Sequence, residues 1–325
     1  MNKILTLAHE LIRDAFSACF ELFKIMIPVI IGVKLLQEFE LIQYVAMPLK
    51  PIMGLLGLPA ELGLAWATAM VNSMYAGLIV FLSLARDMTL NAEQVTIFAV
   101  LLLIGHGFLV EGAIAQRSGA KFVFQILTRL FGAFALGLIL HWTYSTSGTL
   151  QEPAVILFQS SGPTDPTLLQ WAWGETKNLL SIFGIVLGLM LMMRILSAIR
   201  AVDLMNALLR PILKLIGIGP KASTITIIGF TLGLAYGGGL IINESQSGRI
   251  DRKDVFYSLT LMGLCHSMIE DTLLMVLIGA HLSGIFWGRL LFGLVTMAIL
   301  VQITRRLSQS FCDRYLWGPQ KQTTD

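Results

Sequence analysis

The chain has 325 residues, of which 55% are hydrophobic and only 13% are charged, and its formal net charge is +3. A soluble domain carries about 25% charged residues, so this chain has too few charges to cover a globule in water. The composition therefore predicts a protein embedded in lipid. The small net charge excludes nucleic acid as an expected partner.

In chain order, the apolar segments long enough to enter a membrane as helices, at roughly 20 residues per span, are 20–36, 62–85, 95–115, 122–142, 179–196, 224–243, 255–279 and 285–303. Before them, apolar and charged residues mix at near-helical spacing in residues 1–19. That pattern predicts an amphipathic cytoplasmic helix lying on the membrane before the first span. The predicted fold class is an all-α integral membrane protein.

The cysteines and glycines give no sign of a cofactor. Cys19, Cys265 and Cys312 lie far apart and form no CxxC pair, so neither a disulfide framework nor a structural zinc site is expected. The glycine run 237–239 has no following Lys-Ser or Lys-Thr, so it is not a phosphate-binding loop. Energy for any transport is therefore expected from an ion gradient rather than from ATP.

An internal repeat organises the chain, because a shift of 160 positions aligns its two halves without a gap. The non-apolar matches are Pro51 with Pro211, His106 with His266, Glu111 with Asp271, and Arg129 with Arg289. Apolar matches arise by chance in a membrane protein, but these four in one register do not. We predict repeats at 20–142 and 177–304, an extracytoplasmic linker at 143–176 and a cytoplasmic tail at 305–325.

Each half follows the same order of elements. A span leads into an amphipathic stretch with a central proline, then into an apolar segment with a polar or glycine-rich middle, and finally into two more spans. The middles are residues 70–77 and 233–239. Glycine weakens a helix by about 1 kcal/mol relative to alanine, so each of these segments is predicted to be a re-entrant or broken helix.

Charge placement decides the topology, because Lys and Arg accumulate in cytoplasmic loops. With a re-entrant segment each half crosses three times, so the second half is inverted. Most of the 23 Lys and Arg residues, Arg129 among them, then fall on the cytoplasmic side, and the outside keeps Lys34, Lys50, Arg86, Lys177 and Arg289. Four crossings per half would give parallel repeats and would place the uncharged linker in the cytoplasm. We predict inverted repeats, with both termini cytoplasmic.

This organisation resembles the Gate, or nucleoside-recognition domain, superfamily. The likeness is carried by residues 229–271, with the glycine run 237–239, Asn243, Glu244 and His266, and by the weaker copy at 69–111. The superfamily includes concentrative nucleoside transporters, the membrane part of the ferrous-iron transporter and the spore maturation proteins. The resemblance implies hairpins and broken helices around a central site, membrane transport, and a bacterial inner membrane.

His106 and His266 lie near the middle of apolar spans, and Glu111 and Asp271 follow five residues later. A carboxylate at the bilayer centre costs at least about 2.5–3.5 kcal/mol, so intramembrane acids are predicted to be functional. The alternative is that each acid pairs with its histidine or with an arginine and only holds helices together. Five residues rotate about 140° on an ideal helix, so histidine and acid converge only if the helix unwinds or another helix intervenes.

Two roles for these groups stay open. Histidine titrates near neutral pH, so histidine and acid form a candidate proton relay. Imidazole also suits transition metals, and a metal, if any, is expected at His266, Glu270 and Asp271. The other candidate binding residues are the hairpin tips, where half-helix ends can face a solute, and the polar pair after the second one: Asn72, Ser73, Tyr75, Tyr236, Gly237, Gly238, Gly239, Asn243 and Glu244.

The leading hypothesis is a secondary transporter of a small polar solute, nucleoside-like by the resemblance and coupled to protons or a cation, with its site at mid-membrane between the repeats. The alternatives are a non-transporting membrane partner of the spore-maturation type and a divalent-metal permease. No nucleophile or metal set supports an enzyme, and no catalytic residue is expected. The expected partners are the lipid bilayer and the solute or ion; a homodimer or a membrane-protein partner is left open.

Overall fold

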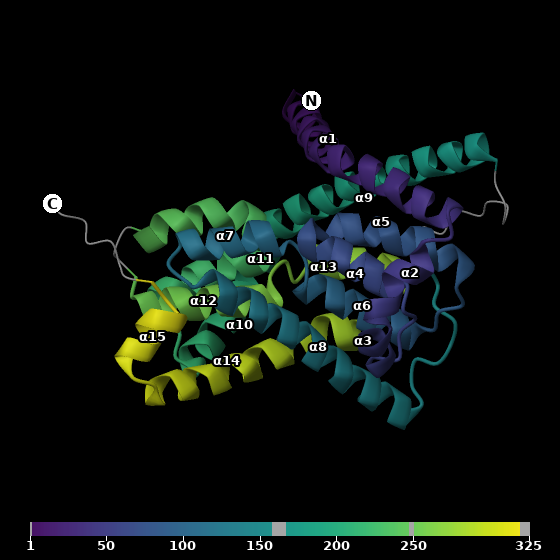
Figure 1. Cartoon of the computed structure of the whole chain (residues 1–325). Helices are drawn as coiled ribbons and strands as arrows, with labels where there is room; N and C mark the ends of the chain where they lie inside the picture. Colours follow the sequence, from purple (N-terminus) through teal and green to yellow (C-terminus); the bar gives the residue numbers. More distant parts are fainter. Residues whose placement is uncertain (1, 158–166, 247–249, 319–325) are drawn as a thin grey trace.

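A computed structural model describes residues 2–157, 167–246 and 250–318, which are mostly helical (Figure 1). The elements of the first half are α1 (Asn2–Glu38), α2 (Ile42–Ala46), η1 (Met47–Leu49), α3 (Lys50–Leu55), α4 (Leu62–Val71), α5 (Met74–Leu84), η2 (Ala85–Asp87), α6 (Ala92–Ile104), α7 (Phe108–Arg117) and α8 (Phe122–Ser147). Those of the second half are α9 (Leu168–Ala198), α10 (Ala201–Ile216), α11 (Pro220–Gln246), α12 (Arg252–Cys265), α13 (Glu270–Leu277), η3 (Ser283–Gly288), α14 (Arg289–Arg306) and α15 (Gln309–Tyr315).

Among the described residues, six helices are long and apolar enough to cross a membrane. Three belong to each half: His9–Glu38, Ala92–Arg117 and Phe122–Ser147 in the first, and Leu168–Leu196, Arg252–Leu277 and Ser283–Arg306 in the second. An odd number of crossings starts the second half on the opposite side of the membrane. The prediction of an all-α integral membrane protein is confirmed, and three candidate spans in each half are the number that the predicted inverted repeats require.

The N-terminal helix differs from the prediction in one respect. Helix α1 runs without interruption from Asn2 to Glu38 and continues through Pro28. From Asn2 onward, the predicted amphipathic stretch and the first span are therefore one helix, with no break near residue 19. Nothing in the local sequence stops the helix there, since residues 1–27 contain neither glycine nor proline.

Helices α4 and α5 form the predicted re-entrant hairpin. The chain turns at Asn72 (φ −114°, ψ −91°), and the extended Ser73 caps α5 by accepting a hydrogen bond from the Ala76 amide. A Cβ placed on Gly77 would lie 2.5 Å from the Ala69 Cβ and 2.8 Å from the Ala65 carbonyl oxygen. These positions are far apart along a continuous helix, so their contact shows that α4 and α5 fold back on each other.

The corresponding segment of the second half is α11, which is broken at Gly233 (φ 78°, ψ 169°). Gly233 stands 160 positions after Ser73, so both segments break at the same place in the repeat. The break was predicted across the glycine-rich stretch 233–239, with its tip at Tyr236, Gly237, Gly238 and Gly239. This placement of the tip is wrong, because residues 236–239 have helical backbone. Among the glycines of this stretch, Gly233 is the one recorded with a positive φ, the conformation that favours glycine.

Matching backbone contacts show the duplication in three dimensions. Gly57 and Gly217 both end a helix in the left-handed conformation, at φ 67° and 103°. The residue after each donates its amide to an equivalent carbonyl: Leu58 to Met53 at 3.0 Å, and Ile218 to Leu213 at 2.9 Å. Such agreement at a spacing of 160 residues follows from one ancestral local structure used twice.

Helices α6 and α12 lie at the centre of the molecule. The spans that contain them are 72% and 78% buried, against 18–39% for the other four. Helix α8 of the first half packs on α12, and η3 of the second half packs on α6, so the two repeats exchange equivalent contacts. Helices α1 and α9 cross each other along one side (Figure 1) and share a small apolar cluster with α5.

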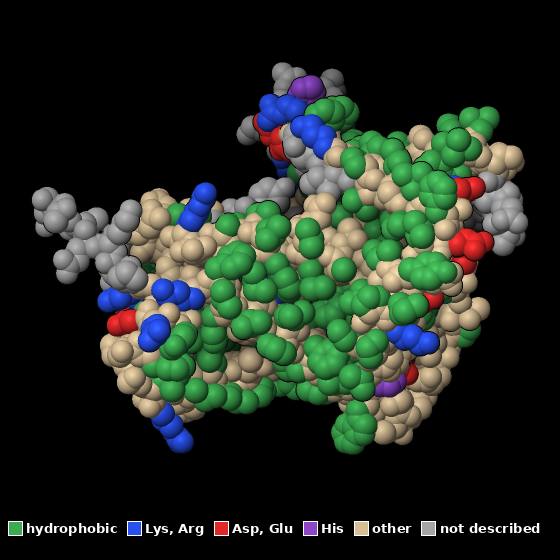
Figure 2. Space-filling model, viewed as in Figure 1, with side chains coloured by type: hydrophobic (Ala, Val, Ile, Leu, Met, Phe, Trp, Pro, Cys, Tyr) green, Lys and Arg blue, Asp and Glu red, His purple; other side chains and the backbone are tan. Residues whose placement is uncertain are grey.

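The outer helices present apolar side chains to their surroundings. Phe131 on α8, Leu180 on α9 and Leu291 on α14 are each more than 60% exposed. Figure 2 shows hydrophobic side chains spread over the middle of one face, with Lys and Arg mainly at the end beside α15 and near the start of α1. This distribution is the one expected for a surface in contact with lipid between two polar ends.

Two arginines do not lie where charge placement put them. Arg129 was predicted on the cytoplasmic side and Arg289 on the outside, but their exposures are 4% and 0%. Both lie inside the protein, against the breaks in the two central spans, so neither reports on topology. An arginine is buried in this way only when it has polar partners, which directs attention to those breaks.

Candidate functional site

The two central spans are both interrupted next to a histidine. Helix α6 ends at Ile104 and α7 begins at Phe108, while α12 ends at Cys265 and α13 begins at Glu270. Gly107 and Ser267 are equivalent positions and adopt positive φ angles of 58° and 45°. The Gly107 amide donates to the Ala69 carbonyl at 2.8 Å, and the Ser267 amide to the Gly229 carbonyl at 3.3 Å. Each central helix is thus unwound and tied to the hairpin segment of its own repeat.

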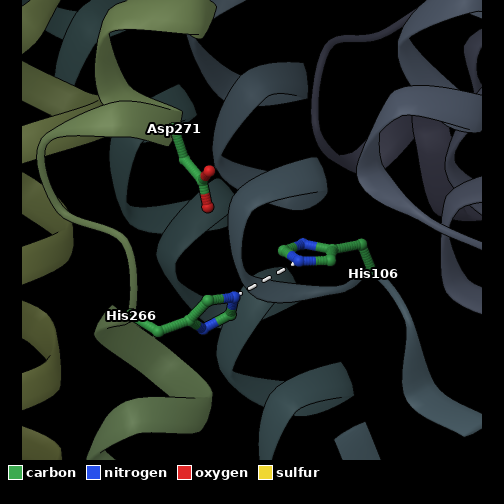
Figure 3. A group of neighbouring side chains, drawn as sticks. All are labelled: His106, His266 and Asp271. Carbon is green, nitrogen blue, oxygen red and sulfur yellow. Dashed lines mark hydrogen bonds between the residues drawn. The ribbon is translucent and has the colours of Figure 1, made fainter. Parts of the chain in front are cut away.

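The histidines meet across the interface between the repeats (Figure 3). His106 Nε2 lies 3.2 Å from His266 Nε2, and the ring centroids are 5.0 Å apart. The Nδ1 atoms lie 2.7 Å from the Leu102 carbonyl oxygen and 2.8 Å from the Met262 carbonyl oxygen. A carbonyl only accepts, so we assign the Nδ1 proton to both rings. In the neutral rings, both Nε2 atoms are then unprotonated.

The two acids approach this histidine pair from opposite repeats. Glu111 Oε1 lies 3.2 Å from His106 Nε2 and 3.6 Å from His266 Nε2. Asp271, His106 and His266 are all buried, and their ligand atoms lie within 4.8 Å of one another. Figure 3 shows the Asp271 carboxylate pointing toward the space between the rings. The unwound helices therefore bring histidine and acid together, which a regular helix would not.

Each arginine closes the helix break of its own repeat. Arg129 donates from Nε to the Ile104 carbonyl at 2.8 Å and from Nη2 to the His106 carbonyl at 2.7 Å, and its Nη1 pairs with Glu111 Oε2 at 2.5 Å. Arg289 donates from Nη2 to the His266 carbonyl at 3.1 Å and to Met268 Sδ at 2.9 Å. These bonds satisfy carbonyl groups that the interrupted helix leaves free.

The second arginine is less well satisfied than the first. Within the described part of the chain, Nε and Nη1 of Arg289 have no hydrogen-bond partner, and Asp271 does not pair with Arg289 as Glu111 pairs with Arg129. Two guanidinium nitrogens are therefore buried without an acceptor, at a cost that folded proteins seldom accept.

Helix ends add to the electrostatics of the cluster. His106 and His266 follow the C-terminal ends of α6 and α12, where the helix dipole favours positive charge. Glu111 and Asp271 lie in the first turns of α7 and α13, where the dipole favours negative charge. The broken spans thus stabilise carboxylates and also favour a cation at the histidine pair.

A small cavity adjoins the cluster on the side of Glu111. It has about 10 Å³ of room, near the minimum for one water, and is lined by Glu111, Gly112, Ala115, Gln125, Ile126, Arg129, Leu259 and Gly263. Helix α7 runs from the cluster to the end beside α15, where the Gly318 amide donates to the Gly119 carbonyl. The cavity therefore lies between the cluster and that end of the molecule.

The structure brings together four of the predicted site residues: His106, Glu111, His266 and Asp271. Of the remaining predicted residues whose side chains the structure describes, none has a recorded contact with these four. Glu270 is half-buried at the start of α13, outside the group with metal-ligating geometry, and His106 takes its place beside His266 and Asp271.

The other predicted residues belong to the hairpin segments. Asn72, Ser73 and Tyr75 are half-buried at the turn between α4 and α5. Gly239 and Asn243 are exposed on α11, and Glu244 is half-buried. Tyr236, Gly237 and Gly238 lie in the helical backbone of α11, but their side-chain environment is outside the described residues.

Sequence reasoning named helix unwinding as one of two ways to bring histidine and acid together, but it did not locate the helix breaks that make the cluster. The signal was present in the first half, where Gly105 and Gly107 flank His106. It was absent in the second, because Ser267 adopts the left-handed conformation without being glycine. The capping role of Arg129 and Arg289 was also missed, although an arginine was considered as a partner for each acid.

The comparisons with known proteins agree on membrane character and go no further. The chain is 26% identical over 288 residues to an uncharacterized membrane protein, YvoD, of Bacillus subtilis (strain 168). The alignment covers 88% of this chain and 89% of that protein. No protein-family model matches the chain, and no solved structure matches it.

Proposed function

We propose that the protein is an ion-coupled secondary transporter of a small polar solute, with its coupling ion held at the cluster of His106, Glu111, His266 and Asp271. One observation carries the proposal: two broken central spans place buried ionisable groups at the interface between inverted repeats. Ionisable groups inside a membrane protein mark ion pathways and proton relays. Broken helices at a repeat interface are the sites at which secondary transporters bind substrate and ion.

The unequal arginines support a cycle with two states. In inverted-repeat transporters, alternating access is a rocking of one repeat against the other around the site between them. Here Glu111 is paired with Arg129, whereas Asp271 turns toward the histidines and leaves Arg289 short of acceptors. In the opposite state we expect the roles to be exchanged, with Asp271 paired to Arg289 and Glu111 released.

The orientation follows from the basic residues that remain at the surface. Arg252, Arg305, Arg306 and Arg314 lie at the ends of α12, α14 and α15, at the end of the molecule beside α15. We propose that this end faces the cytoplasm, with both termini on that side of a bacterial inner membrane. The small cavity beside Glu111 then lies on the cytoplasmic route to the cluster.

The resemblance to the Gate superfamily agrees with this proposal but does not fix the solute, and a nucleoside-like compound stays one candidate. A divalent-metal permease is a second candidate function, because the cluster contains a group with metal-ligating geometry. A non-transporting membrane partner is the remaining alternative, and stable co-purification with another membrane protein would favour it.

The test is uptake by the purified protein in proteoliposomes under imposed proton, sodium or divalent-cation gradients. The solutes are a panel of nucleosides, nucleobases, amino acids and organic acids, together with the divalent cations themselves. We expect one gradient to drive uptake, and His106→Gln and Glu111→Gln to abolish it. His281→Gln is the matched control, since His281 is exposed and pairs with Ser283. Uptake that is unchanged in both cluster variants would refute the proposed ion site.

A further inference from the structure

We infer that the cluster is a binding site for a divalent first-row transition metal ion, ligated by His106, His266 and Glu111, with Asp271 as the fourth ligand. The role of that ion, as coupling ion or as cargo, rests on the proposed function. Binding itself does not, because it follows from the geometry of four buried side chains.

The first argument is the position of the two histidine lone pairs. Both Nδ1 atoms face carbonyl oxygens at hydrogen-bond distance, so both carry protons. The two Nε2 atoms then face each other as acceptors at 3.2 Å. Two lone pairs at that distance repel each other unless a cation lies between them. The histidine pair therefore has the arrangement of a site that is completed by a positive ion.

The second argument is the spacing of the ligand atoms. His106 Nε2, His266 Nε2 and Glu111 Oε1 form a triangle with edges of 3.2, 3.2 and 3.6 Å. Zinc binds imidazole nitrogen and carboxylate oxygen at about 2.0–2.2 Å in a tetrahedron, so neighbouring ligand atoms are expected about 3.3 Å apart. The triangle matches one face of that tetrahedron. Asp271 approaches the same histidines from the other repeat (Figure 3).

The third argument is the environment of the ligands. Metal-binding histidines usually donate their second N–H to a carbonyl or carboxylate, which fixes the ring, and here both rings do so. Glu111 offers Oε1 to the cluster while Arg129 holds Oε2. These contacts orient three of the four ligands in the absence of any ion, so little reorganisation is needed to bind one.

The ligand set selects the class of metal. Imidazole nitrogens with carboxylate oxygens suit zinc, iron, cobalt and nickel, whereas calcium and magnesium prefer oxygen alone. Cys265 is adjacent to His266, but its Sγ donates to the Arg289 carbonyl at 3.0 Å. The site therefore has no thiolate, and it differs from the cysteine-rich sites that hold structural zinc.

The surrounding charges make the ion exchangeable. The carboxylates of Glu111 and Asp271 are balanced by the guanidinium groups of Arg129 and Arg289, so a divalent ion adds uncompensated positive charge. We expect binding weaker than at a structural zinc site, as transport requires, because a transported ion must also leave. The cavity beside Glu111 and Arg129, with about 10 Å³ of room, lies next to these charges.

The experiment is a titration of the purified, detergent-solubilised full-length protein with cobalt(II), a tetrahedral probe with visible absorption. We expect one equivalent of cobalt to give the intense bands of a tetrahedral nitrogen–oxygen site, and zinc to displace it. His106→Gln, His266→Gln and Asp271→Asn should each weaken binding at least about tenfold, since even second-shell changes cost 10–100-fold at metal sites. Glu270→Gln and His281→Gln are matched controls that should leave it unchanged.

Absence of tetrahedral cobalt absorption in the wild-type protein would overturn the inference, and a shared proton would then be the cation between the histidines. The same holds if the cluster variants bind cobalt as tightly as the controls. Displacement of cobalt by zinc is measured on the wild-type protein alone. The test therefore gives a result even if a variant fails to fold. Cobalt binding without ion-driven uptake would support the metal site and refute the proposed transport function. Uptake without cobalt binding would support transport and refute the metal site.

Discussion

The two repeats carry the same histidine, acid and arginine at equivalent positions, yet the first set closes into an ion pair and the second does not. Glu111 reaches Arg129 while also touching both histidines, whereas Asp271 lies with the histidines and leaves Arg289 short of acceptors. The acids differ by one methylene, and aspartate is the shorter. A duplicated framework has thus acquired two unequal acids around one shared centre, so the site is asymmetric.

The arginines give the largest expected contrast between the halves. Arg129→Met would leave Glu111 buried without its partner, and we expect a loss of about 3–5 kcal/mol in the free energy of unfolding. Arg289→Met removes a charge that is already poorly paired and should cost only about 1–2 kcal/mol. Denaturant unfolding in detergent measures both. Equal costs for the two variants would show that Arg289 has partners as good as those of Arg129.

Substituting each acid by the other tests whether side-chain length explains why Glu111 pairs with Arg129 and Asp271 does not pair with Arg289. Asp271→Glu adds the methylene that would let the acid reach Arg289, and we expect a gain of about 1–2 kcal/mol in the free energy of unfolding from the new charged hydrogen bond. Glu111→Asp should lose a similar amount. The shift in unfolding midpoint gives the sign. If Asp271→Glu destabilises the protein, the pairing proposed for the opposite state is wrong.

The two hairpin segments also differ in how tightly their glycines are packed. Gly77→Ala would drive a methyl group against Ala65 and Ala69, and overpacking of this kind costs about 1–3 kcal/mol. Gly239 corresponds to Ile79 of the first half, but nothing lies within 4 Å of a Cβ placed there. We therefore expect Gly239→Ala to change stability by no more than about 0.5 kcal/mol. Thermal unfolding followed by circular dichroism distinguishes the two, and a neutral Gly77→Ala would contradict the tight hairpin.

Modest effects of about 1 kcal/mol are expected at the helix breaks, and the two substitutions tested there have opposite signs. Gly107→Ala places a Cβ at φ 58°, which costs about 1 kcal/mol. Ser267→Gly removes a Cβ at φ 45° and should gain about the same amount. Measured under one set of conditions, the pair forms its own control. Changes of the same sign would show that backbone strain does not dominate at these positions.

Much of the fold could be predicted from the sequence. A protein in lipid needs long apolar segments, which are easily recognised, and Pro51, His106 and Glu111 each have a counterpart 160 positions later that reveals the repeat. The hairpin turn at Asn72 was predictable because polar residues interrupt an apolar segment there. The break in α11 was misplaced because glycine is tolerated within a packed helix, and only Gly233 needs its freedom of backbone angle. The sequence alone does not reveal that a residue other than glycine, such as Ser267, is held at positive φ by tertiary contacts.

The site was less predictable than the fold. The sequence singled out the histidines and acids, since polar groups in apolar spans are costly. It did not show that His106 and His266 face each other, because that contact depends on how two distant halves pack. It also placed Arg129 and Arg289 at opposite membrane surfaces, because a charge rule assumes that arginine is solvated. In this protein they are held by carbonyl groups that the broken helices expose.

The contact between His106 and His266 has an evolutionary consequence. A residue that touches its own duplicate lies on the axis relating the two repeats, as the same residue does in a two-fold homodimer. A half-length ancestor would therefore have formed this centre by pairing with an oppositely inserted copy of itself. One gene would then have encoded both acids, so they would have been identical. Once the gene was duplicated, the two copies could diverge, and in this fused chain one acid is glutamate and the other aspartate.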